Sequence, residues 1–369
     1  MLENGPASLA RWQDKGLLLD RAVRQDWRLL EIDEKLLQEV IYNGVTIKGS
    51  ADQEAVLCTG KATYALKHVE TTNTLYMVPS SDSSCQTDTG KVCVKATAAA
   101  HLEMSQMAPQ LKDLDAVLQD TELRGEDEGT STSGRDSRPP MTFDELLSTT
   151  QASAAELEVA LQERGALEYD GCWRLMSGAL LGDTLEVLLL TAAQHGWGSC
   201  IPLAEAGQAM STDGFDPRLT VHCARLHAQP DRTADDAVTL DTRKVCLHFA
   251  RKLLTERKQW PLDDFKEAWQ SSIPEGMTVD RAMLKGEALI EGSGGAEESL
   301  ISLSIAKLPS DPCARFARLF ALRPRWVLPD LEPYLADLQI PGRSAEALLL
   351  TYARASQDQA NGPVLYSAR

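Results

Sequence analysis

The feature that most constrains the fold of this chain is a succession of short β-type runs within residues 27–79. The runs cover residues 27–32, 45–48, 55–58, 63–69 and 75–78, and Gly, Asn, Asp or Ser bounds each of them. Short runs separated by turn residues are typical of a small antiparallel sheet or barrel. We therefore predict an N-terminal antiparallel β domain that spans residues 1–118.

Helical signals accompany these runs. Asp33 can cap a helix over residues 34–42, and Asn43-Gly44 can end it. Further candidate elements are strands over residues 91–96 and 101–105 and a short helix over residues 109–118.

Residues 119–140 (QDTELRGEDEGTSTSGRDSRPP) mark the clearest change of composition. The stretch is polar, rich in Gly, Ser and Thr, and has no aromatic side chain. It cannot bury enough apolar surface to fold by itself, so we predict a flexible linker between two domains.

After residue 140 the apolar period lengthens to that of helices. Thr142 with Glu145 and Ser153 with Glu156 are capping boxes, each before an apolar helical run. Two short apolar runs around Asp170-Gly171 then predict a β-hairpin. Two helices followed by a hairpin are the layout of a winged-helix unit, which we place at residues 141–240, with a mostly helical stretch over residues 180–227 completing it.

Similar layouts follow twice more. The second has helices over residues 242–256, 262–271 and 279–285 and strands over residues 288–291 and 300–306. The third has helices over residues 312–320, 328–338 and 344–356 and a strand over residues 364–366. The predicted fold class is thus α+β: the β domain, then winged-helix units at residues 141–240, 241–310 and 311–369.

Composition excludes several classes of protein. No apolar run approaches the length of about 18 residues that a membrane span needs, and the N-terminus lacks the layout of a secretory signal. The 8 cysteines have no regular spacing, which favours reduced, mostly buried thiols in a nuclear or cytosolic protein. The net charge of −17 falls entirely within residues 1–240, so any contact with DNA phosphates should lie closer to the C-terminus.

Catalytic and cofactor motifs are missing from the sequence. A phosphate-binding loop ends in Gly-Lys-Ser or Gly-Lys-Thr, whereas Ala62 follows Gly60-Lys61 and Val92 follows Gly90-Lys91. There is no Gly-x-Ser-x-Gly elbow and no His-Glu-x-x-His. We therefore predict a protein that is not an enzyme and has no cofactor.

Zinc binding has one candidate set of ligands: His222-Cys223 and Cys246-x-His248. Both pairs lie in predicted helices, where neighbouring side chains point about 100° apart and converge poorly on one ion. Buried helical thiols and imidazoles at the solvent edge are the simpler interpretation.

Basic residues in the last third are the one functional constellation. Arg315, Arg318, Arg323 and Arg325 span one predicted helix and its exit, and Arg343 and Arg354 bracket the last predicted helix. Our candidate DNA contacts are Arg315, Arg318, Arg343 and Arg354, with Arg281 and Lys285 of the middle unit as a second choice. The same pattern is also typical of a solvated helix face. Trp173, Trp260, Trp269 and Trp326 are interpreted as core anchors.

Several segments are similar to the Dcc family ("defective in sister chromatid cohesion"). In the N-terminal part these are residues 53–58 (QEAVLC), residues 63–67 (TYALK) and Thr72-Asn73 before the strand at residues 75–78. Farther on they are residues 169–175, 265–277 (FKEAWQSSIPEGM), 284–286, 316–326 and 348–366.

The resemblance implies a non-catalytic adaptor subunit of an alternative replication factor C clamp loader, acting in the nucleus in DNA replication and sister chromatid cohesion. In that family the β domain is a barrel completed by two partners, the small Ctf-type subunit and the C-terminal tail of the large Ctf-type ATPase. The winged helices reach the catalytic subunit of polymerase epsilon and bind DNA, single- or double-stranded, without sequence preference. The alternative is a tandem winged-helix scaffold of an assembly that does not contact DNA.

Overall fold

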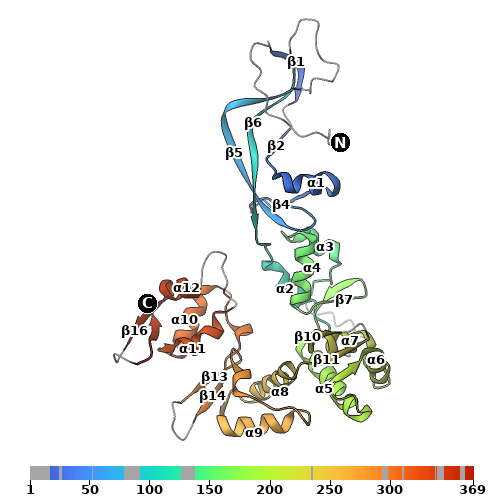
Figure 1. Cartoon of the computed structure of the whole chain (residues 1–369), viewed down its shortest axis with the longest axis vertical. Helices are drawn as coiled ribbons and strands as arrows, with labels where there is room; N and C mark the ends of the chain where they lie inside the picture. Colours follow the sequence, from blue (N-terminus) through green and yellow to red (C-terminus); the bar gives the residue numbers. More distant parts are fainter. Residues whose placement is uncertain are drawn as a thin grey trace. The chain divides into compact units, whose positions relative to one another are not determined.

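The computed structural model describes residues 17–24, 27–51, 53–78, 92–125, 138–233, 236–292, 298–309, 311–336, 338, 345–357 and 362–369. The chain forms two compact units, Met1–Leu180 and Leu181–Arg369. The first combines a 6-stranded sheet with helices and a hairpin, and the second combines helices with small three-stranded sheets (Figure 1). The predicted α+β class is therefore confirmed.

The sheet of the first unit is built on two long antiparallel strands, β5 and β6, which form a twisted ribbon (Figure 1). Its members are β1 Leu17–Arg24, β2 Leu29–Leu30, β3 Thr46–Lys48, β4 Val56–Cys58, β5 Thr63–Met77 and β6 Val92–Met107. The strand order is β1-β6-β5-β4-β3, and β2 also pairs with β6. The predicted antiparallel pairing is present from β3 through β4 and β5 to β6, whereas β1 and β2 run parallel to β6.

The long strands also correct the predicted strand lengths. Residues 63–69 and 75–78 were expected to form two strands but contribute to one, β5, and β6 likewise unites two predicted strands. A break was expected there because Asn73, within the polar run after Glu70, is a weak strand former. A register irregularity between Glu70 and Leu75 accommodates them, and such irregularities let a ladder continue past extra residues. Of the predicted run 27–32, Leu29–Leu30 forms the strand.

Helix α1 (Glu34–Asn43) follows its local signals. Asp33 accepts a hydrogen bond from the backbone of Lys35, and Gly44, at φ 72°, ends the helix as predicted. Because only glycine adopts that conformation readily, the Asn-Gly pair is a stop signal. Within the sheet, Val56 and Leu57 of β4 are fully buried.

The rest of the first unit is a small helical module. It contains α2 Lys112–Asp120, α3 Phe143–Thr149, α4 Ala154–Glu163, β7 Leu167–Tyr169 and β8 Cys172–Arg174. Both predicted capping boxes are present, at the starts of α3 and α4. Asp170 and Gly171 both have positive φ, as a two-residue hairpin turn requires, and β7 pairs with β8. The core includes Leu114, Leu118 and Leu157.

The predicted linker over residues 119–140 does not separate two domains. Thr121 and Leu123 are buried, and the Leu123 backbone N–H donates to the Leu175 carbonyl at 2.7 Å. On the other side, the Trp173 N–H donates to the Met141 carbonyl at 2.9 Å. Residues 126–137 lie outside the described residues. Since both flanks pair with β8 or the residues after it, this segment is an insertion within the helical module.

Hydrogen bonds also join the sheet to this module, so residue 118 marks no boundary. The Lys48 Nζ donates to the carbonyls of Leu147, Thr150 and Ala152 at 2.6, 3.1 and 2.7 Å. Thr63 Oγ1 donates to Glu156 Oε2 at 2.5 Å. The predicted separate domains 1–118 and 141–240 are thus linked in one unit as far as residue 180.

The second unit begins with a module that the sequence did not predict as a separate one. Its elements are α5 Gly178–His195, β9 Cys200–Pro202, α6 Leu203–Ser211, α7 Pro217–Leu226, β10 Ala228–Thr233 and β11 Ala237–Leu240. The stretch 180–227 was expected to complete the preceding unit. It instead packs around its own core, which includes Leu188, Ile201 and Val238.

Two further modules follow. One contains α8 Thr242–Glu256, β12 Gln259–Pro261, α9 Leu262–Ser272, the 3₁₀ helix η2 Arg281–Leu284, β13 Ala288–Glu291, β14 Ser299–Ser302 and η3 Ile305–Lys307. The last contains α10 Pro312–Leu322, β15 Trp326–Val327, α11 Leu328–Leu331, η4 Glu332–Tyr334, α12 Ala345–Tyr352, β16 Ala353–Ser356 and β17 Leu365–Ala368. The predicted last helix, 344–356, was too long, because residues 353–356 pair with β17.

All three modules of the second unit begin with a helix and a strand, continue with helical segments and end their sheet with two strands. The helical segments are α6 and α7 in the first module, α9 and η2 in the second, and α11, η4 and α12 in the third. In each sheet the last strand is central and pairs with both others, in the orders β10-β11-β9, β12-β14-β13 and β15-β17-β16. Trp269 and Trp326 are fully buried, as predicted for core anchors, and their indoles donate to the carbonyls of Cys246 and Leu319. Trp173 and Trp260 are half-buried.

Candidate functional site

Arg315, the first candidate DNA contact, is buried and is not a surface residue. Its side chain is 2% exposed, Nε donates to the Pro309 carbonyl at 2.6 Å and a terminal nitrogen donates to the Tyr334 carbonyl at 3.1 Å. A guanidinium in this position cannot reach a phosphate, so the assignment was wrong. The arginine lies on the same stripe of α10 as Phe316 and Leu319, where it holds the helix to η4.

The other three residues of the set are not brought together as a described cluster. Arg318 is exposed on α10, and Arg354 is exposed on β16, where its backbone pairs with Ser367. Arg343 lies outside the described residues. These positions remain predicted DNA contacts, supported so far by exposure of Arg318 and Arg354.

Arg281 and Lys285 lie on and just after η2, at a cavity of about 370 Å³ within the second unit. Both side chains are exposed, but Arg281 forms an ion pair with Glu298 at 3.0 Å. Asp280 and Asp330 line the same cavity. Because its charges are mixed, the cavity is a weaker phosphate site than the sequence suggested. Arg323 likewise forms an ion pair with Asp330, at 2.9 Å.

The predicted zinc ligands do not assemble among the described residues. Burial raises the pKa of Cys223 to about 12, so its thiol stays protonated. Cys246 is buried in the core that contains Trp269. His248 Nε2 lies 3.3 Å from Glu186 Oε1, on α5. Cys223 and Cys246 are thus buried helical thiols, and the imidazole of His248 is half-buried beside Glu186.

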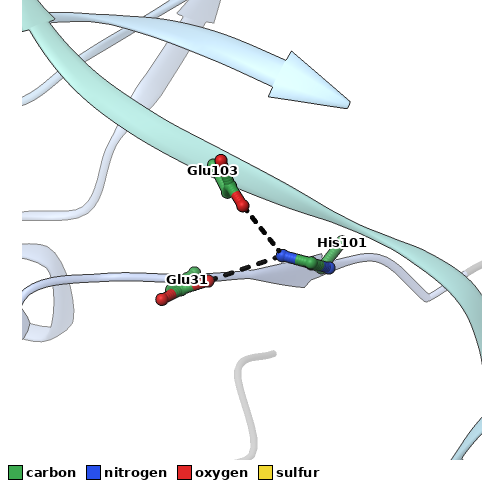
Figure 2. Close-up of side chains that lie close together, drawn as sticks. All are labelled: Glu31, His101 and Glu103. Atoms are coloured by element: carbon green, nitrogen blue, oxygen red, sulfur yellow. Dashed lines mark ion pairs between the residues drawn. The ribbon is translucent and has the colours of Figure 1, made fainter. Parts of the chain in front are cut away.

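A cluster that sequence reasoning missed lies on the sheet of the first unit. Figure 2 shows His101 between Glu31 and Glu103, with its Nε2 3.5 Å from Glu31 Oε2 and 3.4 Å from Glu103 Oε1. His101 and Glu103 are two positions apart on β6 and share one face, and Glu31 comes directly after β2. The pairing of Leu29–Leu30 with β6 creates this cluster. The sequence carries no signal for that parallel pairing, because the two segments lie far apart in the chain.

The sheet around this cluster has edges that no described strand covers. β4 pairs only with residues 63–65 of β5, so most of the outer edge of β5 is open within the described part of the chain. β3 is the last strand on its side of the sheet. Unpaired edges readily accept added strands from another chain. Among the helices that the structure describes, none is both long and apolar enough to cross a bilayer.

The fold and these surfaces define a protein of tandem helix-and-sheet modules that follow an open-edged sheet. A family profile described as "Sister chromatid cohesion protein Dcc1" matches residues 27–335. The chain is 31% identical to "Sister chromatid cohesion protein DCC1" of Danio rerio over 368 residues, which cover 95% of this chain and 91% of that protein. The proteins of the same name from Homo sapiens and Saccharomyces cerevisiae are 29% and 23% identical, over 94% and 58% of this chain and 90% and 58% of their own lengths. The chain belongs to the Dcc1 family of sister chromatid cohesion proteins, as the resemblance predicted.

Proposed function

We propose that this chain is a non-catalytic adaptor subunit of an alternative replication factor C clamp loader, and that it links the loader to polymerase epsilon and to DNA in the nucleus. Membership of the Dcc1 family supports a role in sister chromatid cohesion. Binding to a clamp loader, to polymerase epsilon and to DNA goes beyond what family membership supports and is proposed in addition.

The observation that carries the proposal is the order of elements that recurs in the second unit. Each module has a helix and a strand, then helical segments, then a pair of strands whose last member is central in a three-stranded sheet, and this order is compatible with a winged-helix unit. We infer that residues 181–240, 241–310 and 311–369 are three such units. Tandem winged helices present several similar faces, and these can contact DNA and proteins at the same time.

The open sheet supports the proposed assembly. We infer that the small Ctf-type subunit and the tail of the large Ctf-type ATPase add strands to the free edges of β3, β5 and β6 and complete a barrel. Added strands would satisfy backbone groups that are otherwise left to solvent.

DNA binding is tested with the full chain in a fluorescence anisotropy assay on two unrelated duplexes and one single strand. Replacing Arg318 and Arg354 by glutamate should weaken binding about equally on all sequences and lower the salt slope by about one to two. The control replaces Lys61 and Lys95, exposed on the first unit, by glutamate. It makes the same change in net charge and should leave the slope unchanged.

The alternative, a scaffold that does not contact DNA, has one specific observation in its favour. Arg315 is buried, and Arg281 and Arg323 are paired with carboxylates, so the basic surface is smaller than predicted. If the wild-type chain shows no salt-dependent affinity for any of the three DNAs, the scaffold is the better account.

A further inference from the structure

A cavity of about 300 Å³ lies in the first unit, where helices α2 and α3 meet the loop before β4. In Figure 1 both helices lie at the β4 end of the sheet. The cavity is lined by Gln53, Gln110, Asp113, Leu114, Val117, Arg138, Leu146, Thr149, Thr150 and Gln151. None of these residues belongs to a strand of the sheet, so the cavity is separate from the open strand edges. Its volume is at the lower end of the range for small-molecule pockets, which suits one short ligand group.

The side chain of Gln151 shows that the cavity lacks a hydrogen-bond donor. Gln151 is 5% exposed, and its Nε2 donates to the Glu54 carbonyl at 2.9 Å, which fixes the orientation of the amide. The Gln110 N–H donates to the Gln151 carbonyl at 3.0 Å, so the backbone is held as well. The Oε1 of Gln151 is buried and accepts no hydrogen bond from any described residue. Because buried polar atoms ordinarily have a partner, this oxygen indicates that a donor from outside the chain completes the site.

Two opposite charges line the same cavity and are available to a ligand. Asp113, in the first turn of α2, and Arg138 are both exposed. Neither forms an ion pair with the other or with a further residue in the described part of the chain. The lining therefore carries one cation and one anion and is close to neutral. A purely anionic or purely cationic ligand would meet one like charge, whereas a neutral polar group suits both.

The floor of the cavity is apolar. Leu114, Val117 and Leu146 are 2%, 6% and 1% exposed and line the cavity, where they can contact the methylene groups of a ligand. Together with Gln151 and Arg138, this floor matches a group that has an N–H donor and an oxygen acceptor on a short aliphatic stem. A primary carboxamide has this combination, with two N–H donors and one carbonyl acceptor.

We propose that this cavity binds the carboxamide side chain of a glutamine, whose amide nitrogen donates to Gln151 Oε1 and whose carbonyl accepts from the Arg138 guanidinium. Asp113 would accept a hydrogen bond from the backbone N–H, or the free ammonium group, of the same glutamine. The side chain comes from the free amino acid or from a segment of a partner protein, and both sources present the same chemistry. Glutamate has the same shape but no N–H for Gln151, so the site should discriminate against it. The inference does not depend on the proposed clamp-loader role.

The experiment is a methyl NMR titration of the full chain, labelled at leucine and valine, because Leu114, Val117 and Leu146 line the cavity. The probes are N-acetyl-L-glutamine N-methylamide, the matching glutamate derivative and free L-glutamine. The blocked glutamine should bind with a dissociation constant of about 1 mM, which a ligand of about 14 non-hydrogen atoms reaches at ordinary ligand efficiency. The glutamate derivative should bind about tenfold more weakly or worse, since it leaves Gln151 Oε1 without a donor.

Two variants test the assigned contacts. Gln151→Met removes the acceptor and should weaken binding of the blocked glutamine about tenfold or more. That variant also loses the hydrogen bond to the Glu54 carbonyl, so circular dichroism checks its fold. Arg138→Met changes an exposed residue and should weaken binding by a smaller factor with the fold intact. The matched control is Arg124→Met, which is exposed, does not line the cavity and should leave the affinity unchanged.

The source of the side chain follows from the two glutamine probes. Tighter binding of free L-glutamine supports a site for the amino acid, and tighter binding of the blocked probe supports a site for a polypeptide segment. If neither probe shifts the three methyl groups saturably, the cavity holds an ordered water only and the inference is overturned. Equal affinity for the glutamine and glutamate derivatives, or unchanged affinity in both folded variants, overturns it as well. No partner subunit or DNA is used, so the result is independent of the proposed function.

Discussion

Replacing Arg315 by alanine should destabilise the protein and leave its DNA affinity almost unchanged. The side chain is 2% exposed and donates to the carbonyls of Pro309 and Tyr334. A hydrogen bond from a charged donor contributes about 1.5–3 kcal/mol, and each carbonyl that stays buried without a donor is costly. Removal of the buried charge returns part of its desolvation cost. We therefore expect the free energy of unfolding to fall by about 3–5 kcal/mol.

Urea denaturation measures this change. Trp326 is fully buried and its ring centroid lies 5.9 Å from that of Tyr334, so tryptophan fluorescence reports on the same core. The matched control is Arg318→Ala, one turn along the same helix and exposed, which should change stability by less than about 0.5 kcal/mol.

In DNA binding the order of the two variants should be reversed, so that Arg318→Ala has the larger effect. Arg318→Ala should weaken DNA binding, and folded Arg315→Ala should not, because only an accessible guanidinium releases counterions from a phosphate. Two results together would show that Arg315 is a surface residue that contacts DNA. One is a decrease of less than about 1 kcal/mol in the free energy of unfolding of Arg315→Ala, and the other is a lower salt dependence of its DNA affinity.

Three further changes test the architecture. Lys48→Met should reduce the free energy of unfolding by about 2–4 kcal/mol in urea denaturation, because three carbonyls lose a charged donor; a cost no larger than that of Lys61→Met would contradict the link between sheet and helices. Burial lowers the pKa of His227, assisted by the nearby charges of His248, Lys244 and Arg251, so the folded state favours the neutral ring. The contribution of the neutral His227 ring to the free energy of unfolding is complete above the unfolded pKa of 6.5 and is lost as the pH falls below that value. The free energy of unfolding should therefore fall less steeply with decreasing pH in His227→Gln than in the wild-type chain. Equal slopes would show that His227 does not contribute to the acid sensitivity. A protease site inserted within residues 126–137 should allow cleavage without separation of the fragments on native size exclusion, since both flanks are held by the β8 region; two separate peaks would restore the predicted linker between domains.

Local signals in the sequence were reliable wherever one short segment decides its own structure. The Asp33 cap, the Asn-Gly stop, both capping boxes and the Asp170-Gly171 hairpin depend on groups within a few residues of each other. The helix over residues 242–256 was predicted to the residue, because its cap and apolar stripe are both local.

Pairings between distant segments were not predictable in this way. β1 and β2 join β6 in parallel, and this registers Glu31 against His101 and Glu103. The polar run at residues 71–74 lies within β5 because Glu70 before it and Leu75 after it both pair with β6, across a register shift. The first helical module was divided wrongly because its α2 precedes the polar insertion in the sequence but packs with the helices after it.

The sequence by itself determined the α+β class, the local caps and turns, and, through its resemblance, the Dcc1 family. Only the tertiary structure decided which charges are usable. Arg315 and Arg318 look alike in the sequence and are three positions apart, yet one is buried and the other exposed. The physical reason is that burial depends on what packs against a helix, here η4 against α10 through the Tyr334 carbonyl. The cluster of Glu31, His101 and Glu103 has the same origin, because these side chains meet only when β2 pairs with the distant strand β6.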